Sequence, residues 1–229
     1  MKEAGETTQV HDRGSGNRID IAADAVLSAA IIVEGDDNRI EVGAGGVISS
    51  DDPAREVAGI EVRGKGNQVL IGPGARLNIS LRIHGDGCRM IVGRDCVLTF
   101  NANLRAGGSI EIGDHTTMVK GALQVHETGS ISIGRDCMIS TLVYLSVSDI
   151  HPIYDRATGQ RINPAASITI GEHVWLGLRS MIMKGARIDD GAIVAAGAVV
   201  SGHVPANVIV TGAPARVQRE NVEWRRDFE

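Results

Sequence analysis

Bulky aliphatic residues recur at every sixth position through the last third of the chain. They are Ile170, Leu176, Ile182, Ile188, Val194 and Val200. Four positions after each of the first five lies a small or β-branched residue, namely Val174, Ser180, Ala186, Ala192 and Ala198. A six-residue period matches neither an α-helix nor a simple hairpin meander. It predicts a chain laid along flat faces, with one aliphatic side chain pointing inward from each face and a small residue at each corner.

The N-terminal half repeats on a longer period. Segments such as NRIDIAADAVL (17–27), NRIEVGAGGVI (38–48) and SISIGRDCMI (130–139) follow one another mostly at intervals of 20 or 21 residues. Three six-residue faces account for 18 residues, so each interval corresponds to one coil with a slightly longer corner. The interval of 29 residues predicts an excursion at 49–56. The interval of 37 residues is either two coils or one coil with a large excursion, and we favour a protruding loop around 148–167.

We therefore predict an all-β fold, a parallel β-solenoid of about nine or ten coils with a protruding loop near 148–167. A solenoid needs a cap at each end, and the polar N-terminal segment and the C-terminal tail are the candidates. The tail has helical composition, with Val217, Val222 and Trp224 available for packing. The expected division is a solenoid domain over 1–215 and a tail over 216–229 that forms a short C-terminal helix.

Composition narrows the possible partners and location. Aromatic residues make up only 3% of the chain, which suits a narrow solenoid filled by aliphatic side chains. A net charge of -5 argues against nucleic acid or an anionic membrane as the main partner. No apolar run approaches the ~20 residues of a membrane span. Three cysteines without CxxC spacing suggest a reducing cytoplasmic location, with Cys96 and Cys137 packed at corners.

One stretch of the chain resembles a known family. The segment SDIHPIYDRATGQRINPAASITIGEHVWLG (148–177), then KGARI (184–188), AAGAVV (195–200), VPANVIVTGAPARV (204–217) and Trp224, resembles the hexapeptide-repeat acyltransferases. It is most similar to their sugar O-acetyltransferase branch, which acts on capsule, O-antigen and sialic-acid-type polymers. The resemblance implies a left-handed parallel β-helix, a homotrimer, a carbohydrate acceptor, and acetyl-CoA bound between adjacent prisms as the acyl donor without a metal.

The resemblance also implies catalytic roles. His151 lies where the six-residue period breaks, and an imidazole can exchange a proton near neutral pH, so His151 is the expected general base. Asp149 lies two residues earlier and could either orient that imidazole or cap a local turn. Trp175 follows the corner residue Val174 and should point outward, either beside the thioester or into subunit packing.

Further residues are candidates for binding. Tyr144, Tyr154 and Asp155 are expected to line the acceptor pocket. Gly177, Ala195 and Ala196 are expected at corners where backbone groups could hold the pantetheine arm, although corner packing alone would also require small residues. Lys184 and Arg216 are candidates for the CoA phosphates, Arg216 because its guanidinium offers a fork of donors. Either cation could equally be solvated surface charge.

Three other functions remain open on the same sequence. An N-acetyltransferase acting on a nucleotide-linked amino sugar would use the same base and donor. A non-catalytic β-solenoid binding module would need neither His151 nor Trp175. A trimeric zinc enzyme would need three histidines, and here only His115 and His126 are close in sequence, without a convincing third.

Overall fold

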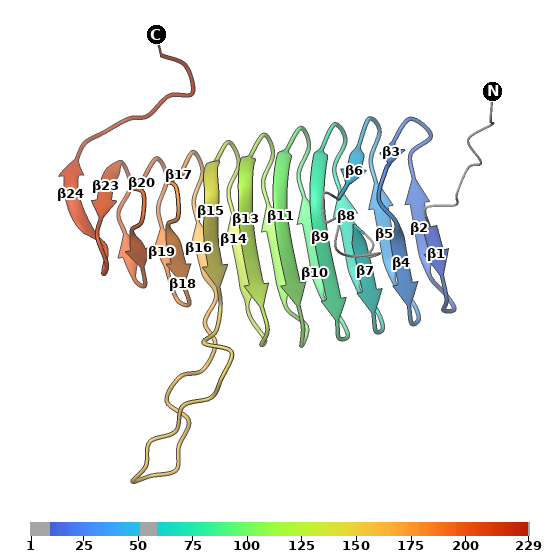
Figure 1. Ribbon diagram of the computed structural model, residues 1–229, viewed down its shortest axis with the longest axis horizontal. Helices are drawn as coiled ribbons and strands as arrows, with labels where there is room; N and C mark the ends of the chain where they lie inside the picture. The colour runs from blue at the N-terminus through green and yellow to red at the C-terminus, as the bar shows by residue number, and fades with distance from the viewer. Residues whose placement is uncertain (1–9, 51–58, 229) are drawn as a thin grey trace.

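The computed structural model describes residues 10–50 and 59–228, which form 24 short β-strands and no helix. The first nine residues of the polar N-terminal segment predicted as a cap, and most of the excursion at 49–56, fall outside the described residues. None of the described residues forms a helix long and apolar enough to cross a membrane. All strands but the last stack in parallel, coil upon coil, along the long axis of the molecule (Figure 1).

The coils form a prism with three flat faces, which we call faces 1, 2 and 3. Face 1 contains β3 (Val26–Leu27), β6 (Val47–Ser49), β17 (Trp175–Leu176), β20 (Ile193–Val194) and β23 (Val208–Thr211). Face 2 contains β1 (Val10–Asp12), β4 (Ile31–Glu34), β7 (Ile60–Arg63), β18 (Met181–Met183) and β21 (Val199–Val200). Four longer strands bend across faces 1 and 2: β9 (Arg76–His84), β11 (Val97–Leu104), β13 (Thr117–Val125) and β15 (Met138–Ser146).

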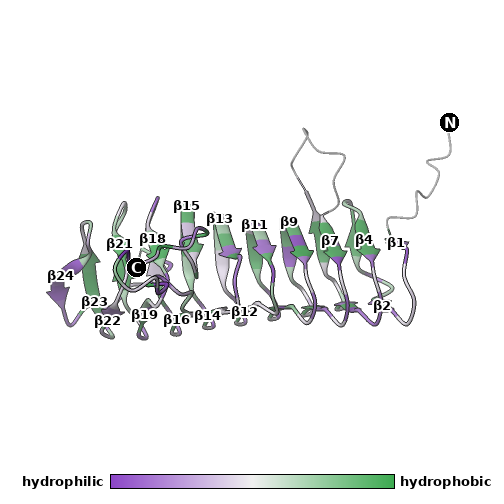
Figure 2. Cartoon of the chain, turned by 90° about the horizontal axis from the view of Figure 1, so that it is seen from below, coloured by the Kyte–Doolittle hydropathy of each residue, from purple (hydrophilic) through white to green (hydrophobic). Residues whose placement is uncertain are grey.

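Face 3 is a separate sheet of nine strands, which matches the predicted number of coils. It contains β2 (Arg18–Ile21), β5 (Arg39–Val42), β8 (Gln68–Ile71), β10 (Arg89–Val92), β12 (Ser109–Ile112), β14 (Ser130–Ile133), β16 (Ile168–Ile170), β19 (Arg187–Ile188) and β22 (His203–Val204). Seen from below, face 3 runs along one side of the molecule, and β4 to β15 run along the other (Figure 2).

The six-residue period is confirmed as the inward-facing register. The six aliphatic residues from Ile170 to Val200 are each at most 2% exposed, and the corner residues between them are equally buried. Successive coils align these side chains in register, as in the pairs Ile170↔Ile188 and Leu176↔Val194. Each coil therefore buries its inner surface against the coils above and below it.

Asparagines form a ladder at the corner between faces 2 and 3. Asn38 donates from Nδ2 to Asn17 Oδ1 at 3.1 Å, and Asn67 donates from Nδ2 to Asn38 Oδ1 at 3.0 Å. The ladder ends where the backbone N–H of Cys88 donates to Asn67 Oδ1 at 2.8 Å. These corner amides are buried away from water. Each one is satisfied instead by a hydrogen bond to a residue of the adjacent coil.

The three cysteines are buried free thiols, as corner packing predicts. Burial is the main cause that raises the pKa of Cys96 and of Cys137 to about 11. Thiols held in this protonated form are poor nucleophiles, so they act as small apolar side chains.

The predicted C-terminal helix is wrong. The tail instead begins with β24 (Arg216–Glu220), which pairs antiparallel with β23, and residues 221–228 contain no helix. The reason is the open edge of the last coil: β23 offers unpaired backbone groups, and pairing with them outweighs the helical composition of the tail. β24 still covers the end of the solenoid, with all five of its residues exposed.

Candidate active site

The predicted excursion is confirmed as a long loop. Strand β15 ends at Ser146 on face 2 and β16 begins at Ile168 on face 3, so the loop leaves from the corner between these two faces. It projects well away from the prism (Figure 1). An insertion at a corner interrupts no strand. A corner between stacked coils can therefore accept a long loop without disturbing the core.

Asn163 organises the root of this loop. Its Nδ2 donates to Asp149 Oδ2 at 2.8 Å and to the backbone oxygen of His151 at 2.9 Å. Its Oδ1 accepts from the backbone N–H of Ile153 at 2.6 Å. Asn163 is only 6% exposed although it belongs to a surface loop. The two halves of the loop are therefore joined through one buried amide.

The carboxylate of Asp149 faces Lys184 rather than His151. Lys184 Nζ and Asn163 Nδ2 both donate to Asp149 Oδ2. The Lys184 hydrogen bond is the first cause that lowers the pKa of Asp149, followed by the bond from Asn163. Because the folded pKa is depressed, this contribution to loop stability is present at neutral pH and is lost as the pH falls below about 4.

The imidazole of His151 is exposed, and no hydrogen bond or ion pair joins it to another side chain in the described part of the chain. Its backbone is fixed, because its N–H donates to the Asp149 carbonyl at 2.7 Å and its carbonyl accepts from Asn163. A ring held at a defined point but left open to solvent is free to meet an incoming hydroxyl.

The outer part of the loop is a short hairpin. Tyr154 forms a bridge with Arg161, and Asp155 caps the turn by accepting from the N–H and hydroxyl of Thr158. The backbone bond from Thr158 is the first cause that lowers the pKa of Asp155. Arg161 ties the hairpin back to the prism through an ion pair with Glu127 at 2.7 Å. Tyr154 is exposed, whereas the carboxylate of Asp155 is occupied by its own turn.

A second group of predicted residues lies on the other side of the prism. Trp175 lies on face 1, and its side chain points outward as predicted, with 37% exposed. Gly177, Ala195 and Ala196 lie at the corner between faces 1 and 2. A Cβ at Gly177 would lie 2.7 Å from the Ala196 nitrogen, so coil stacking itself requires glycine there. Arg216 is exposed at the start of β24, beside this same face.

The register of β15 separates the two groups. Its residue Met138 pairs with Trp175 on face 1, whereas Ser146 pairs with Met183 on face 2, just before the loop leaves. Tyr144 lies between them, half-buried on face 2 beside Met181. His151 therefore projects from the corner opposite the face that carries Trp175, and the body of the prism lies between them.

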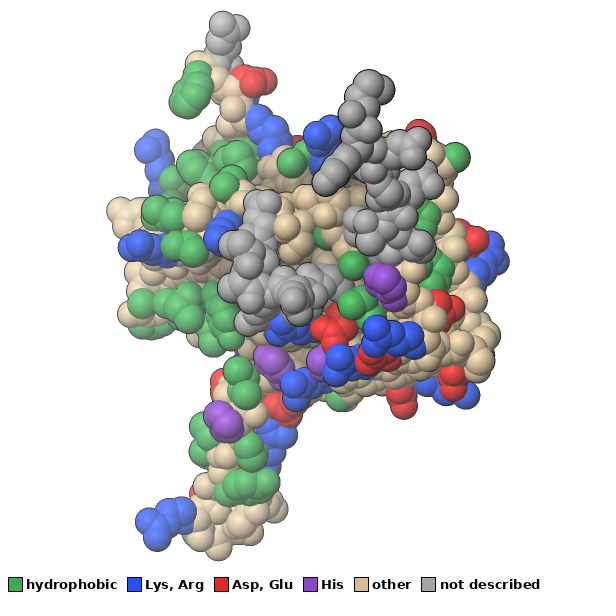
Figure 3. All heavy atoms as spheres, turned by 45° about the vertical axis from the view of Figure 1, so that its right-hand side comes forward, with side chains coloured by type: hydrophobic (Ala, Val, Ile, Leu, Met, Phe, Trp, Pro, Cys, Tyr) green, Lys and Arg blue, Asp and Glu red, His purple; other side chains and the backbone are tan. Residues whose placement is uncertain are grey.

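Basic and imidazole side chains line the corner from which the loop leaves. Arg63 pairs with His84 in the next coil, and Arg105 and His126 follow in the same register. We call these four residues the cationic edge. Figure 3 shows Lys, Arg and His side chains near the root of the loop, with acidic side chains among them. Burial is the first cause that lowers the pKa of His126, so that residue contributes hydrogen bonding more than charge at neutral pH.

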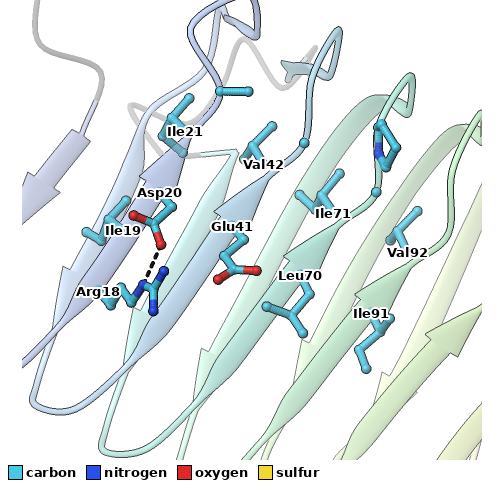
Figure 4. A pocket seen from close by; sticks show the side chains of 14 residues that line it. Arg18, Ile19, Asp20, Ile21, Glu41, Val42, Leu70, Ile71, Ile91 and Val92 are labelled. Carbon is cyan, nitrogen blue, oxygen red and sulfur yellow. Dashed lines mark hydrogen bonds and ion pairs between the residues drawn. The ribbon is translucent and has the colours of Figure 1, made fainter.

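Two other features lie away from these groups. A concavity on the outer surface of face 3 is lined by Arg18, Asp20, Glu41 and aliphatic side chains, and it holds no imidazole (Figure 4). The described residues contain no group of three or more His, Cys, Asp or Glu arranged to hold a metal ion. His115 lies at the corner between faces 3 and 1, so it is separated from His126 on the cationic edge.

Comparison with known proteins agrees with the sequence. Residues 167–202 match the family model "bacterial transferase hexapeptide (six repeats)". A polysialic acid O-acetyltransferase of Escherichia coli O1:K1 / APEC is 36% identical over 120 residues, which are 52% of this chain and 39% of that protein. One from Neisseria meningitidis is 42% identical over 83 residues, which are 36% of this chain and 39% of that protein. The matched part thus spans about two fifths of these relatives.

Solved structures match over a longer span. The crystal structure of the polySia specific acetyltransferase NeuO superposes with a TM-score of 0.73 and 27% identity, over 96% of this chain and 89% of that one. The polysialic acid O-acetyltransferase OatWY gives a TM-score of 0.67 and 26% identity, over 96% and 92%. These matches confirm the predicted left-handed β-helix, and they confirm the resemblance to the sugar O-acetyltransferase branch of the hexapeptide-repeat acyltransferases.

We expect Asn163→Ala to loosen the loop while the solenoid stays folded. The change removes the acceptor of the Ile153 amide and two donors, and leaving buried groups unpaired costs about 1–3 kcal/mol. Hydrogen exchange at Ile153 should accelerate by roughly tenfold or more. Gln160→Ala, an exposed change in the same loop, is the matched control and should leave that amide unaffected. Equal exchange rates in the two variants would show that Asn163 does not hold the loop.

Proposed function

We propose that this protein transfers the acetyl group of acetyl-CoA to a hydroxyl of a sugar polymer, with His151 as the general base. The observation that supports this most directly is the loop itself. A buried amide fixes its root, an exposed imidazole lies free within it, and it interrupts an otherwise regular β-helix. A purely structural solenoid would require none of these features.

The reaction needs one proton transfer and one acyl transfer. His151 would take the proton of the attacking hydroxyl as its oxygen bonds to the thioester carbonyl carbon. The carbon–sulfur bond then breaks, the acetyl group stays on the sugar oxygen, and the CoA sulfur leaves with the proton returned from the imidazole. Trp175 would line the thioester with its exposed ring edge, and its neighbours at the face 1 corner would line the pantetheine arm. Lys184 would anchor the loop through Asp149 instead of binding phosphate.

We propose that the active site forms between subunits of a cyclic homotrimer. His151 and Trp175 lie on opposite sides of one prism, so a single chain cannot bring both to one substrate. Two different apolar surfaces are also exposed. One is on the loop, at Ile150, Ile153 and Ile162, and the other lies along the face 1–face 2 corner, at Leu142 and Leu178. Two unlike surfaces on one chain favour head-to-tail contacts that close into a ring.

An extended anionic polymer is the acceptor that we propose. The relatives act, by name, on polysialic acid. Arg105 supports an acceptor of this kind, because it is exposed on the cationic edge and the edge leads to the loop, whereas Arg63 and His84 already lie within ion-pair distance of Glu61. A donor in the form of a CoA thioester also suits the expected cytoplasmic location. Transfer to a nucleotide-linked amino sugar remains the alternative, and an acceptor panel would distinguish the two.

The base assignment predicts that His151→Ala folds, binds acetyl-CoA with unchanged affinity, and loses turnover by roughly 10²–10⁴-fold, the usual contribution of general-base catalysis. His203→Ala is the matched control, since that imidazole pairs with Asp189 on face 3. Steady-state kinetics with a sialic-acid polymer measure both variants. A His151→Ala protein with near-parental turnover would falsify the assignment.

The shared site predicts complementation between defective chains. His151→Ala and Trp175→Ala should each be strongly impaired alone. In a ring of three, every mixed trimer contains one junction at which both contributions are intact. Equal random mixing should therefore restore about a quarter of the parental rate. Mixtures that stay as inactive as the separate variants, although light scattering shows that subunits have exchanged, would contradict the shared site.

The cationic edge predicts a selective effect of Arg105→Ala. The KM for the anionic polymer should rise by roughly three- to tenfold, and the difference should shrink at high salt because exposed charges are screened. The KM for a neutral sugar acceptor should not change. Arg94→Ala is the matched control, because that arginine is exposed and pairs with Asp114 at the corner between faces 3 and 1, away from the loop. An equal loss on charged and neutral acceptors would contradict a charge-based contact.

A further inference from the structure

The C-terminal residues fold back over the prism after β24. The backbone N–H of Val222 donates to the carbonyl of Asn207 at 3.0 Å, which starts the segment at the corner between faces 3 and 1. Trp224 then reaches His173 two coils away, and Arg226 reaches Asp136 and Thr117 in the coils beyond. We call residues 222–226 the C-terminal clasp. It lies on the side of the molecule opposite the protruding loop (Figure 1).

Trp224 is held by a reciprocal pair of hydrogen bonds. Its Nε1–H donates to the His173 carbonyl at 2.8 Å, and His173 Nε2 lies 3.1 Å from the Trp224 carbonyl. The two rings stack with centroids 4.0 Å apart at an interplanar angle of 7°. Trp224 is consequently only 5% exposed, which is unusual for a residue so near a chain end.

Both ring nitrogens of His173 face groups that can only accept. Nδ1 lies 2.6 Å from Asp136 Oδ2, and Nε2 faces the Trp224 carbonyl. Burial acts to raise the pKa of Asp136, but His173 and Arg226 together hold it below its ordinary value. The clasp therefore closes on the Asp136 carboxylate, which both His173 and Arg226 contact.

Arg226 fastens the end of the clasp. Its Nε donates to Asp136 Oδ1 at 3.0 Å, and Nη1 donates to Thr117 Oγ1 at 2.9 Å. Its Nη2 donates to the Cys137 carbonyl at 3.1 Å. The guanidinium also lies 5.8 Å from the centroid of the Trp224 ring. The neighbouring Arg225 is exposed, and among the described residues its ion pair is with Glu223 in the same segment.

The clasp ends against Trp175. The rings of Trp175 and Trp224 lie 6.3 Å apart at an angle of 50°, and His173 lies two positions before Trp175 in the chain. In its own sheet Trp175 is flanked in register by Met138 and Ile193 of the adjacent coils. We infer that the clasp is a positioning element, which supports one side of Trp175 so that its exposed side is presented to the acylated arm of acetyl-CoA. The expected effect on acetyl-CoA rests on the proposed function, whereas the contact between the clasp and Trp175 does not.

The chain contains two tryptophans, so each can be observed alone. Trp175→Phe leaves Trp224 as the reporter, and Trp224→Phe leaves Trp175. In both backgrounds Arg226→Ala should increase acrylamide quenching and shift the emission maximum to the red. Arg225→Ala is the matched control and should change neither reporter. In the otherwise parental chain, Arg226→Ala should raise the KM for acetyl-CoA by roughly ten- to a hundredfold, since small misplacements are costly, while the KM for the acceptor stays unchanged.

The outcomes separate the possibilities. Unchanged quenching of Trp224 would overturn the docking of the clasp. Exposure of Trp224 without any change at Trp175 would overturn the positioning role. If Trp175 becomes exposed while the acetyl-CoA kinetics stay unchanged, the clasp does not affect acetyl-CoA binding, and that part of the inference is overturned. A parental chain that binds no acetyl-CoA would refute the proposed function, whereas the quenching result would still decide whether the clasp positions Trp175.

Discussion

The stacking of one inward aliphatic side chain on the next determines the rest of this structure. Each coil can bury its inner residues only against its neighbours, so all three faces must keep register along the prism. This requirement fixes the strands and leaves the corners free to vary. The parts that could bind or react therefore lie at corners or on outward positions. They are the loop at 147–167, the outward Trp175, the asparagine ladder and the C-terminal clasp.

Three faces also decide what one chain can do alone. A loop that leaves between faces 2 and 3 projects away from face 1, whatever its own sequence. For the same reason, the exposed isoleucines of the loop and the exposed leucines at the face 1–face 2 corner lie on different sides of the prism. The proposed active site, which combines His151 and Trp175, would therefore form only in an assembly. The clasp supports the Trp175 side of such a site, and the amide of Asn163 supports the His151 side.

The sequence predicted the parts of the structure that depend on local period. The inward residues from Ile170 to Val200, the coil number and the position of the loop all follow from spacing. The helix predicted for the tail was wrong because composition carries no information about the free edge of β23, to which β24 binds. The carboxylate of Asp149 was expected either at His151 or in a local turn, and it instead contacts Lys184, which is 35 positions away.

The contacts that sequence reasoning missed are also long-range. Trp224 meets His173 across 51 positions, and Arg226 meets Thr117 across 109. Asn163 lay inside the resembling segment, in the dipeptide Ile162–Asn163, but nothing in its spacing indicated burial. A buried asparagine in a loop is recognisable only when its partners are known.

A structure of the protein with bound CoA would test the central claim most directly. The account predicts that the CoA sulfur lies beside Trp175 of one subunit, with the His151 imidazole of a neighbouring subunit within reach of an acceptor hydroxyl at that sulfur. A CoA molecule bound away from face 1, or a sulfur approached by His151 and Trp175 of the same chain, would contradict it.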